Sequence, residues 1–221
     1  MRAYLLASAT ASILLLSAGP ALAQAANPDQ PSGSAPAERD HFGFLAAAKI
    51  GGLVPFDGLQ PGYQFGVEAG LILPVLHHGL SIGADVDYAQ ATTSGTTTDP
   101  RVTGGSYNWN INQEFFTIMP VIMWRVTTLS KLLVPFIGAG PRIYMYRSTV
   151  YGQAGANNPI SNTTEVSSQV GFGVPFGLEV KVGPGGFLAE FLAQWGLLEH
   201  TATGDSQAAA IGLSLGYRLA I

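Results

Sequence analysis

The chain ends on the stretch Ile211-Gly-Leu-Ser-Leu-Gly-Tyr-Arg-Leu-Ala-Ile221, which alternates without a break between large apolar side chains and small or polar ones. Successive residues of a β-strand face opposite sides of the sheet. One face of this stretch is therefore uniformly apolar, whereas the other carries only Gly, Ser, Arg and Ala. The pattern predicts a strand with one apolar face.

Two earlier stretches have the same period, residues 80–90 and 170–181. Less regular but compatible patterns complete a set of eight, and each is long enough to cross a membrane as a tilted strand of about 9–11 residues. The expected strands lie near 42–53, 62–73, 79–90, 113–126, 133–147, 165–181, 187–198 and 207–221.

The second face, with its small side chains, indicates whether the apolar face of a closed sheet points inward or outward. A soluble barrel buries its large apolar side chains and shows long polar ones to water. Gly, Ala and Ser make a poor solvated surface, but they fit a narrow lumen. The pattern therefore favours an all-β, eight-stranded antiparallel up-and-down transmembrane β-barrel with its apolar face outward. A soluble barrel is the alternative.

The N-terminus resembles an export signal in its layout. Arg2 precedes an apolar run that is too short to span a bilayer, and Ala21-Leu-Ala23 forms a small-x-small cleavage site before Gln24. We expect a signal peptide over 1–23, a flexible periplasmic segment over 24–41 that is rich in Pro, Ala, Ser and Gln, and the barrel over 42–221. The alternative is an uncleaved N-terminal anchor.

The composition excludes several kinds of site. The net charge of −4 becomes −5 once Arg2 is removed, because 9 basic residues then face 14 acidic ones. Such a balance argues against nucleic-acid binding, which needs a basic patch. The absence of cysteine rules out disulfides and thiolate metal sites. No cofactor or metal is expected.

The expected connections alternate in length. Longer ones near 54–61, 91–112, 148–164 and 199–206 alternate with short ones near 74–78, 127–132 and 182–186. Outer-membrane barrels have long external loops and short periplasmic turns, so both termini would be periplasmic. The Thr-rich residues 91–100 are expected to form a mobile external loop.

Three segments carry a resemblance to a known family: Phe136-Ile-Gly-Ala-Gly-Pro-Arg142, Met119-Pro-Val-Ile-Met-Trp-Arg125 and Gly212 to Ile221. The chain resembles the eight-stranded outer-membrane barrels of the OmpA, OmpX and OmpW type over nearly all of 42–221. The resemblance implies a place in the outer membrane of a Gram-negative bacterium, contact with the lipid bilayer and lipopolysaccharide, and assembly machinery that reads the C-terminal strand. The family usually ends in an aromatic residue, whereas this chain ends in Ile221.

Four prolines fall within the expected strands, where each removes a hydrogen bond from the ladder. Pro135 stands at a strand start. The other three require bulges or a local loss of pairing, and they are Pro120, Pro141 and Pro175.

Charged residues within the strands fall on the inward face by alternation. Five are positive and five negative, and in lipid a Lys or Arg would cost about 2–4 kcal/mol at mid-depth. They are Lys49, Glu68, Asp85, Asp87, Arg125, Arg142, Glu179, Lys181, Glu190 and Arg218. Because eight strands enclose a lumen just wide enough for side chains, this balance favours a salt-bridged plug over an open pore. The alternative is that lumen water solvates each charge separately.

Hairpin geometry suggests partners for these charges. Residues equidistant from a turn lie opposite each other, which places Lys49 beside Glu68 and Glu190 near Arg218. Depth divides the ten into two layers. The layer at mid-barrel or further out holds Lys49, Glu68, Asp85, Asp87 and Arg142, and the periplasmic layer holds the rest.

No catalytic constellation stands out. The histidines are His41, His77, His78 and His200, and Glu199 would point away from His200 in a strand. Aromatic residues, among them Tyr107, Trp109, Phe115, Tyr144 and Tyr146, suit interface anchors and lumen filling better than a ligand site.

Three function classes follow in order: a structural or surface barrel of the cell envelope, a narrow OmpW-like passive transporter of small or apolar solutes, and a lipid-modifying barrel enzyme. We expect no enzyme activity, and the sequence does not identify a partner for the external loops.

Overall fold

The computed structural model describes residues 41–56, 59–102, 104–154, 158–197 and 208–221, with side chains of 158–161 left aside. The expected signal peptide and nearly all of the 24–41 segment lie outside this part. No helix that could cross a membrane occurs in the part that is described.

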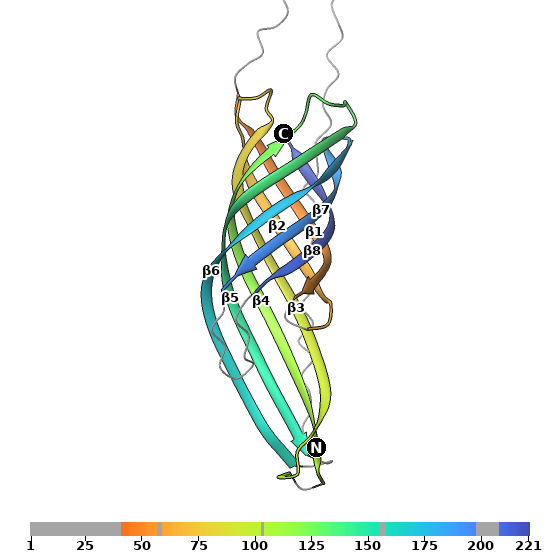
Figure 1. The fold of residues 1–221 in the computed structure, drawn as a ribbon. Helices are drawn as coiled ribbons and strands as arrows, with labels where there is room; N and C mark the ends of the chain where they lie inside the picture. Colours follow the sequence, from red (N-terminus) through yellow and green to blue (C-terminus); the bar gives the residue numbers. More distant parts are fainter. Residues whose placement is uncertain (1–40, 57–58, 103, 155–157, 198–207) are drawn as a thin grey trace, which may run out of the picture. The chain divides into compact units, whose positions relative to one another are not determined.

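Eight antiparallel strands form a closed barrel in simple up-and-down order (Figure 1). The ring closes where β1 pairs with β8, from Leu45 opposite Ala220 to Pro55 opposite Ala210. The strands are β1 Gly43–Pro55, β2 Gly62–Ile72, β3 Leu80–Thr98, β4 Ser106–Arg125, β5 Leu133–Ala154, β6 Asn158–Val182, β7 Gly185–Gly196 and β8 Ala210–Ala220. The expected fold class is confirmed.

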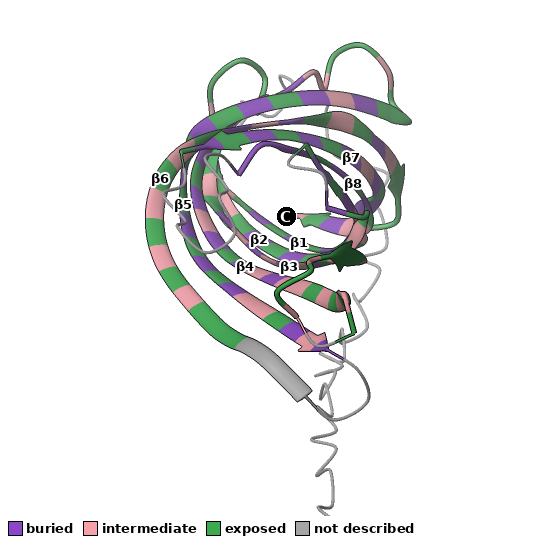
Figure 2. Ribbon diagram, turned by 60° about the horizontal axis from the view of Figure 1, so that its bottom comes forward, coloured by how far each residue is buried: buried purple, intermediate pink, exposed green. Residues whose placement is uncertain are grey.

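Burial alternates along every strand, as the banded ribbons of Figure 2 show. The buried side is the lumen, and the exposed side carries the large apolar residues. In β8, Leu213 and Leu215 are 47% and 62% exposed, whereas Arg218 is completely buried. Phe172 and Phe176 of β6 are also exposed. The barrel is therefore apolar outside and polar inside, which is the inverse of a soluble barrel.

The strands differ in length by about a factor of two, and this difference corrects two of the expected loops. β1, β2, β7 and β8 have 11–13 residues, but β3 to β6 have 19–25. Much of 91–112 and 148–164 is strand, including most of the Thr-rich segment. Pairing of β3 with β2 stops at Gln90 and that of β6 with β7 at Gly171. Beyond these points four strands continue alone.

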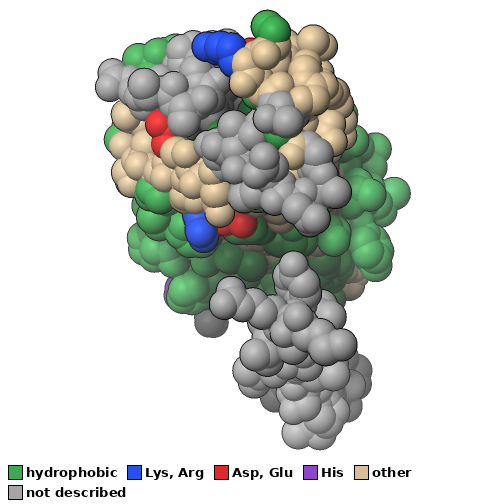
Figure 3. Space-filling model, turned by 90° about the horizontal axis from the view of Figure 1, so that it is seen from below, with side chains coloured by type: hydrophobic (Ala, Val, Ile, Leu, Met, Phe, Trp, Pro, Cys, Tyr) green, Lys and Arg blue, Asp and Glu red, His purple; other side chains and the backbone are tan. Residues whose placement is uncertain are grey.

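We call this four-stranded sheet the extension and define it as residues 91–98, 106–113, 148–154 and 158–165. In Figure 1 it runs from the barrel to the end opposite the C-terminus. Its residues are rich in Thr, Ser, Asn and Gln. Seen from that end in Figure 3, the tip is mostly non-apolar, and apolar side chains gather behind it on the barrel wall. Thr, Ile, Trp and Tyr, which are enriched in strands, recur in this sheet.

The opposite end of the barrel has the short connections, at 73–79, 126–132 and 183–184. The first of them holds Leu76, His77 and His78 in the left-handed region, with φ between 52° and 58°. Gly79 N–H closes this turn on the Leu76 carbonyl at 3.0 Å.

Three prolines sit where the ladder is interrupted. Pairing of β4 with β5 skips from Ile118–Ile143 to Ile122–Ala139, a gap that contains Pro120 and Pro141. Pairing of β5 with β6 skips two residue pairs at Pro175. The local loss of pairing that these prolines require is therefore present in the wall.

Candidate functional site in the barrel lumen

Nine of the ten inward charges are buried, each no more than 5% exposed. The exception is Lys181, which is exposed. It lies opposite Gly186, one pair from the end of the β6–β7 ladder. Its position near the end of the ladder leaves its side chain exposed, so Lys181 is not part of the buried charge set. The buried set therefore holds four positive and five negative residues, not five of each.

Lys49 of β1 bridges two carboxylates from strands on either side of it. Its Nζ lies 2.6 Å from Asp85 Oδ2 on β3 and 2.7 Å from Glu190 Oε1 on β7. The expected partner, Glu68, is not among these contacts. The ladder places Lys49 opposite Gly66 and Glu68 opposite Ala47, so the register expected from the hairpin was wrong by two residues. The ion-pair partners of Lys49 also lie on β3 and β7, not on β2 as expected.

Arg218 of β8 collects three carboxylates. Its guanidinium lies 2.7 Å from Glu68 on β2, 3.6 Å from Glu179 on β6 and 3.8 Å from Glu190 on β7. It also sits 4.4 Å from the centroid of the Phe136 ring, a cation–π arrangement. Glu190 and Arg218 therefore lie close together, as expected, although theirs is the longest of the three contacts.

The remaining two arginines each bind one acid. Arg125 Nη2 on β4 donates to both oxygens of Glu179 at 2.9 Å. Arg142 Nη2 on β5 donates to Asp87 Oδ2 on β3 at 2.7 Å. The first pair joins the Lys49 and Arg218 network through Glu179, whereas Arg142 and Asp87 pair with each other. One network of seven residues plus a separate pair replaces the two expected layers.

Every ion pair of this set shorter than 3.7 Å joins strands that have one strand between them: β1 with β3 and β7, β2 with β8, β3 with β5, β4 with β6, and β6 with β8. Long side chains that converge on the axis of a narrow barrel reach past the adjacent strand. All eight strands contribute at least one buried charge. The ion pairs therefore brace the wall across the lumen.

Apolar residues share the lumen with the charges. Toward the extension, Phe115 and Tyr146 pack edge to face, with ring centroids 4.7 Å apart, in a cluster with Leu53, Leu59 and Tyr144. Met119, Val121 and Leu192 form a second cluster, and Met123, Phe136 and Leu188 with Ala47 a third. The wall thus encloses packed side chains at several levels.

Some lumen residues escaped the sequence reasoning. Gln64 Nε2 donates to Ser214 Oγ at 2.6 Å, and Gln113 and Thr117 are completely or almost completely buried. Ser214 lies on the small and polar face that the sequence assigned to the lumen, and alternation with the nearby charges would have placed Gln64, Gln113 and Thr117 inward as well. The search of the sequence followed formal charge, so it passed over neutral polar side chains.

The histidines give no reactive cluster in the described part. His78 Nε2 lies 3.3 Å from the His41 carbonyl oxygen, and Thr127 Oγ1 donates to the His77 carbonyl at 3.0 Å. His200 and Glu199 lie outside the described residues. No group of three or more metal-binding side chains is found among those that are described.

A closed eight-stranded barrel with this inverted surface is the architecture of small outer-membrane barrels. No family model and no curated protein matches the sequence. Among solved structures, a major outer membrane protein of Thermus thermophilus is similar with a TM-score of 0.52 at 15% identity, over 82% of this chain and 100% of that one. This likeness shows the fold.

Two further structures match with lower scores. Neisserial surface protein A aligns at 18% identity and a TM-score of 0.45, over 80% of this chain and 96% of that one. The N-terminal β-barrel domain of Pseudomonas aeruginosa OprF aligns at 12% identity and a TM-score of 0.40, over 80% and 97%.

Proposed function

We propose that the protein is a small outer-membrane barrel of a Gram-negative bacterium, with a lumen plugged by its own side chains and a structural or surface role in the cell envelope. One observation carries the proposal: every strand places a charge inside the barrel, while large apolar residues cover the outside. In water this arrangement would expose the apolar wall; in lipid it removes that wall from water.

The plug rests on the ion pairs and on the apolar clusters between them. A buried charge that loses its partner costs several kcal/mol, so the network of seven charges and the separate Arg142–Asp87 pair resist being parted. An ion crossing the lumen would have to separate them and pass the Phe115 and Tyr146 rings. The contacts therefore favour a filled barrel over the alternative of a narrow transporter.

Export and assembly belong to the same proposal. Residues 1–23 serve as the signal peptide, 24–41 remain in the periplasm, and 42–221 form the barrel, whose wall contacts lipid and lipopolysaccharide. The C-terminal strand, which closes the ring through the bond of Ile221 N–H to the Phe44 carbonyl at 2.9 Å, is the segment offered to the assembly machinery. No catalytic role is proposed.

Cell fractionation with N-terminal sequencing tests this assignment. The expected product starts at or near Gln24 and appears in the outer-membrane fraction, where unboiled samples migrate as a folded species in gel electrophoresis. A soluble periplasmic product would refute the membrane assignment. An uncleaved N-terminus in the outer membrane would refute only the signal peptide.

A further inference from the structure

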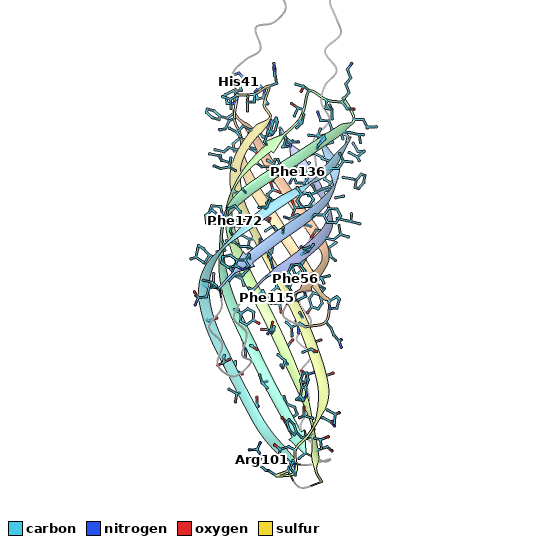
Figure 4. All side chains as sticks on the ribbon, viewed as in Figure 1. His41, Phe56, Arg101, Phe115, Phe136 and Phe172 are labelled. Atoms are coloured by element: carbon cyan, nitrogen blue, oxygen red, sulfur yellow. The ribbon has the colours of Figure 1, made fainter. Side chains whose placement is uncertain are left out.

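The inner face of the extension continues the lumen face beyond the closed ring, and at its start Ile111 packs against the lumen cluster that contains Leu59 and Phe115. Gln113 is completely buried where the extension begins, and alternate residues along β4 then place Ile111, Trp109 and Tyr107 on the same side. All three are half-buried. The neighbouring strands carry mainly Thr, Ser and Gly in this part of the sheet. Figure 4 shows the side chains along this part of the sheet, between the labelled Phe115 and Arg101.

Trp109 lies between two glycines in its row. The ladder pairs it with Gly95 on β3 and Gly152 on β5. The indole covers Gly95, since a Cβ there would meet its Cζ2 at 2.6 Å and its Cε2 at 2.9 Å. Its Nε1 donates to Thr97 Oγ1 at 3.0 Å. The ring is therefore held against the sheet with its only polar atom satisfied, and its other side faces away from the strands.

The surroundings of the ring are polar but uncharged. The row nearer the barrel holds Thr93, Ile111, Val150 and Thr163, and the row beyond it holds Thr97 and Tyr107. Glu165, the one charged residue on this face, lies two rows from Trp109. No Lys or Arg belongs to the described inner face. At the tip Asp99 and Arg101 neutralise each other at 2.7 Å.

We propose that the inner face of the extension binds a neutral oligosaccharide, with Trp109 as the stacking platform. Sugar rings present an apolar C–H face, which suits a fixed indole, and rims of hydroxyls that need donors and acceptors. Thr97 uses its oxygen as an acceptor for Trp109, so its own O–H remains available to donate outward. A face without basic residues does not suit a polyanion.

This inference concerns the purified barrel and holds whatever the cellular role proposed above proves to be. The chain has three tryptophans, and Trp124 and Trp195 are exposed on the outer wall. A variant with Trp124→Phe and Trp195→Phe leaves Trp109 as the single tryptophan, whose emission can be excited selectively. We would titrate it, folded in detergent, with maltohexaose, cellohexaose and chitohexaose, and with a heparin hexasaccharide as a polyanionic comparison.

The expected result is a saturable change in Trp109 emission with at least one neutral hexasaccharide, and none with heparin. Calorimetry should show that Trp109→Ala, made in the otherwise wild-type barrel, binds the same hexasaccharide about tenfold more weakly than the wild type, as the loss of one ring contact implies. Tyr151→Ala is the matched control, because Tyr151 lies on the next strand but on the outer face. It should bind as the wild type does.

Folding of each variant is checked by migration of unboiled samples. Should Trp109→Ala not fold, Thr97→Val takes its place, since it releases the indole N–H at nearly constant volume, and weakened binding is again expected. The proposal is overturned if no neutral hexasaccharide binds, if heparin binds instead, or if Tyr151→Ala loses as much affinity as Trp109→Ala. In those cases Trp109 serves only to cover the Gly95 backbone.

Discussion

Arg142 on β5 and Asp87 on β3 form a buried pair that makes no ion pair with the other seven lumen charges. Replacing Arg142 by Met should leave the Asp87 carboxylate buried without its cation and cost about 3–5 kcal/mol of unfolding free energy. Adding Asp87→Leu removes the stranded charge, so the double variant should be more stable than Arg142→Met alone. Denaturant unfolding in lipid vesicles measures both.

Double-mutant cycles on Lys49 distinguish the ion pair seen in the lumen from the one expected from the hairpin. Lys49 and Asp85 touch at 2.6 Å and should show a large coupling energy. Lys49 and Glu68, the pair expected from the hairpin, form no direct ion pair and should show a much smaller one. Equal coupling in the two cycles would contradict the contacts seen in the lumen.

The pKa of Asp99, at the tip of the β3–β4 connection, depends on its contact with Arg101. Hydrogen bonds from the Arg101 side chain and backbone lower the pKa of the Asp99 carboxyl from 3.8 to about 2. Because the folded pKa is depressed, the contact is fully present above pH 3.8 and is lost as the pH falls toward 2. Titration followed by NMR should give this value, and Arg101→Ala should raise the pKa. An unchanged value in the variant would show that Arg101 is not the cause.

In β8, two adjacent residues face opposite sides of the wall. Leu213→Arg would place a cation in lipid and should cost about 2–4 kcal/mol at mid-depth. Leu213→Ala is the control for the loss of side-chain volume and should fold. Gly212 faces the lumen, where a Cβ would meet the Gln64 amide at 2.8 Å. Refolding yields in vesicles are measured for Leu213→Arg and Leu213→Ala. Normal folding of Leu213→Arg would show that Leu213 does not face lipid.

The extension continues four strands of the barrel, and the Gln60 N–H of the β1–β2 connection also donates to the Thr92 carbonyl at 3.3 Å. Joining Thr93 to Ile111 through an Asn-Gly turn would remove the outer part of the β3–β4 hairpin at a directly opposed pair. The shortened barrel should still fold, because the lumen network and the apolar wall are untouched. Migration of unboiled samples tests this. A failure to fold would show that the extension takes part in forming the barrel.

The sequence predicted the elements that bury one face and missed those that do not. Alternation located β8, the inner part of β3 and the barrel part of β6, because each sets apolar residues against small or charged ones. It ended β3 near Gln90 and began β4 near Gln113, whereas the structure extends them to Thr98 and from Ser106. In the extension β3 is polar on both faces, so the period-two signal is weak although the strand continues. In β4, Tyr107, Trp109 and Ile111 do alternate with asparagines, a signal that the sequence reading passed over.

Across the whole barrel, the inward charges were predictable, but of their partnerships only the proximity of Glu190 and Arg218 was predicted. Alternation along a strand predicts which side of the wall a residue faces, and nine of the ten charged residues assigned to the inward face are buried. Contacts depend on how far long side chains reach across a curved wall, and a single hairpin carries no information on this. The pairs that skip a strand require knowledge of the closed ring, including the β1–β8 register.

We infer that the barrel is inserted in lipid and closed by its own side chains. Conductance of the purified wild-type barrel in planar bilayers, with insertion verified by migration of unboiled samples from the same preparation, tests this most directly. We predict no steady ion current above that of the bare bilayer. A steady, reproducible conductance per inserted barrel would contradict the plug and make a narrow transporter the better description.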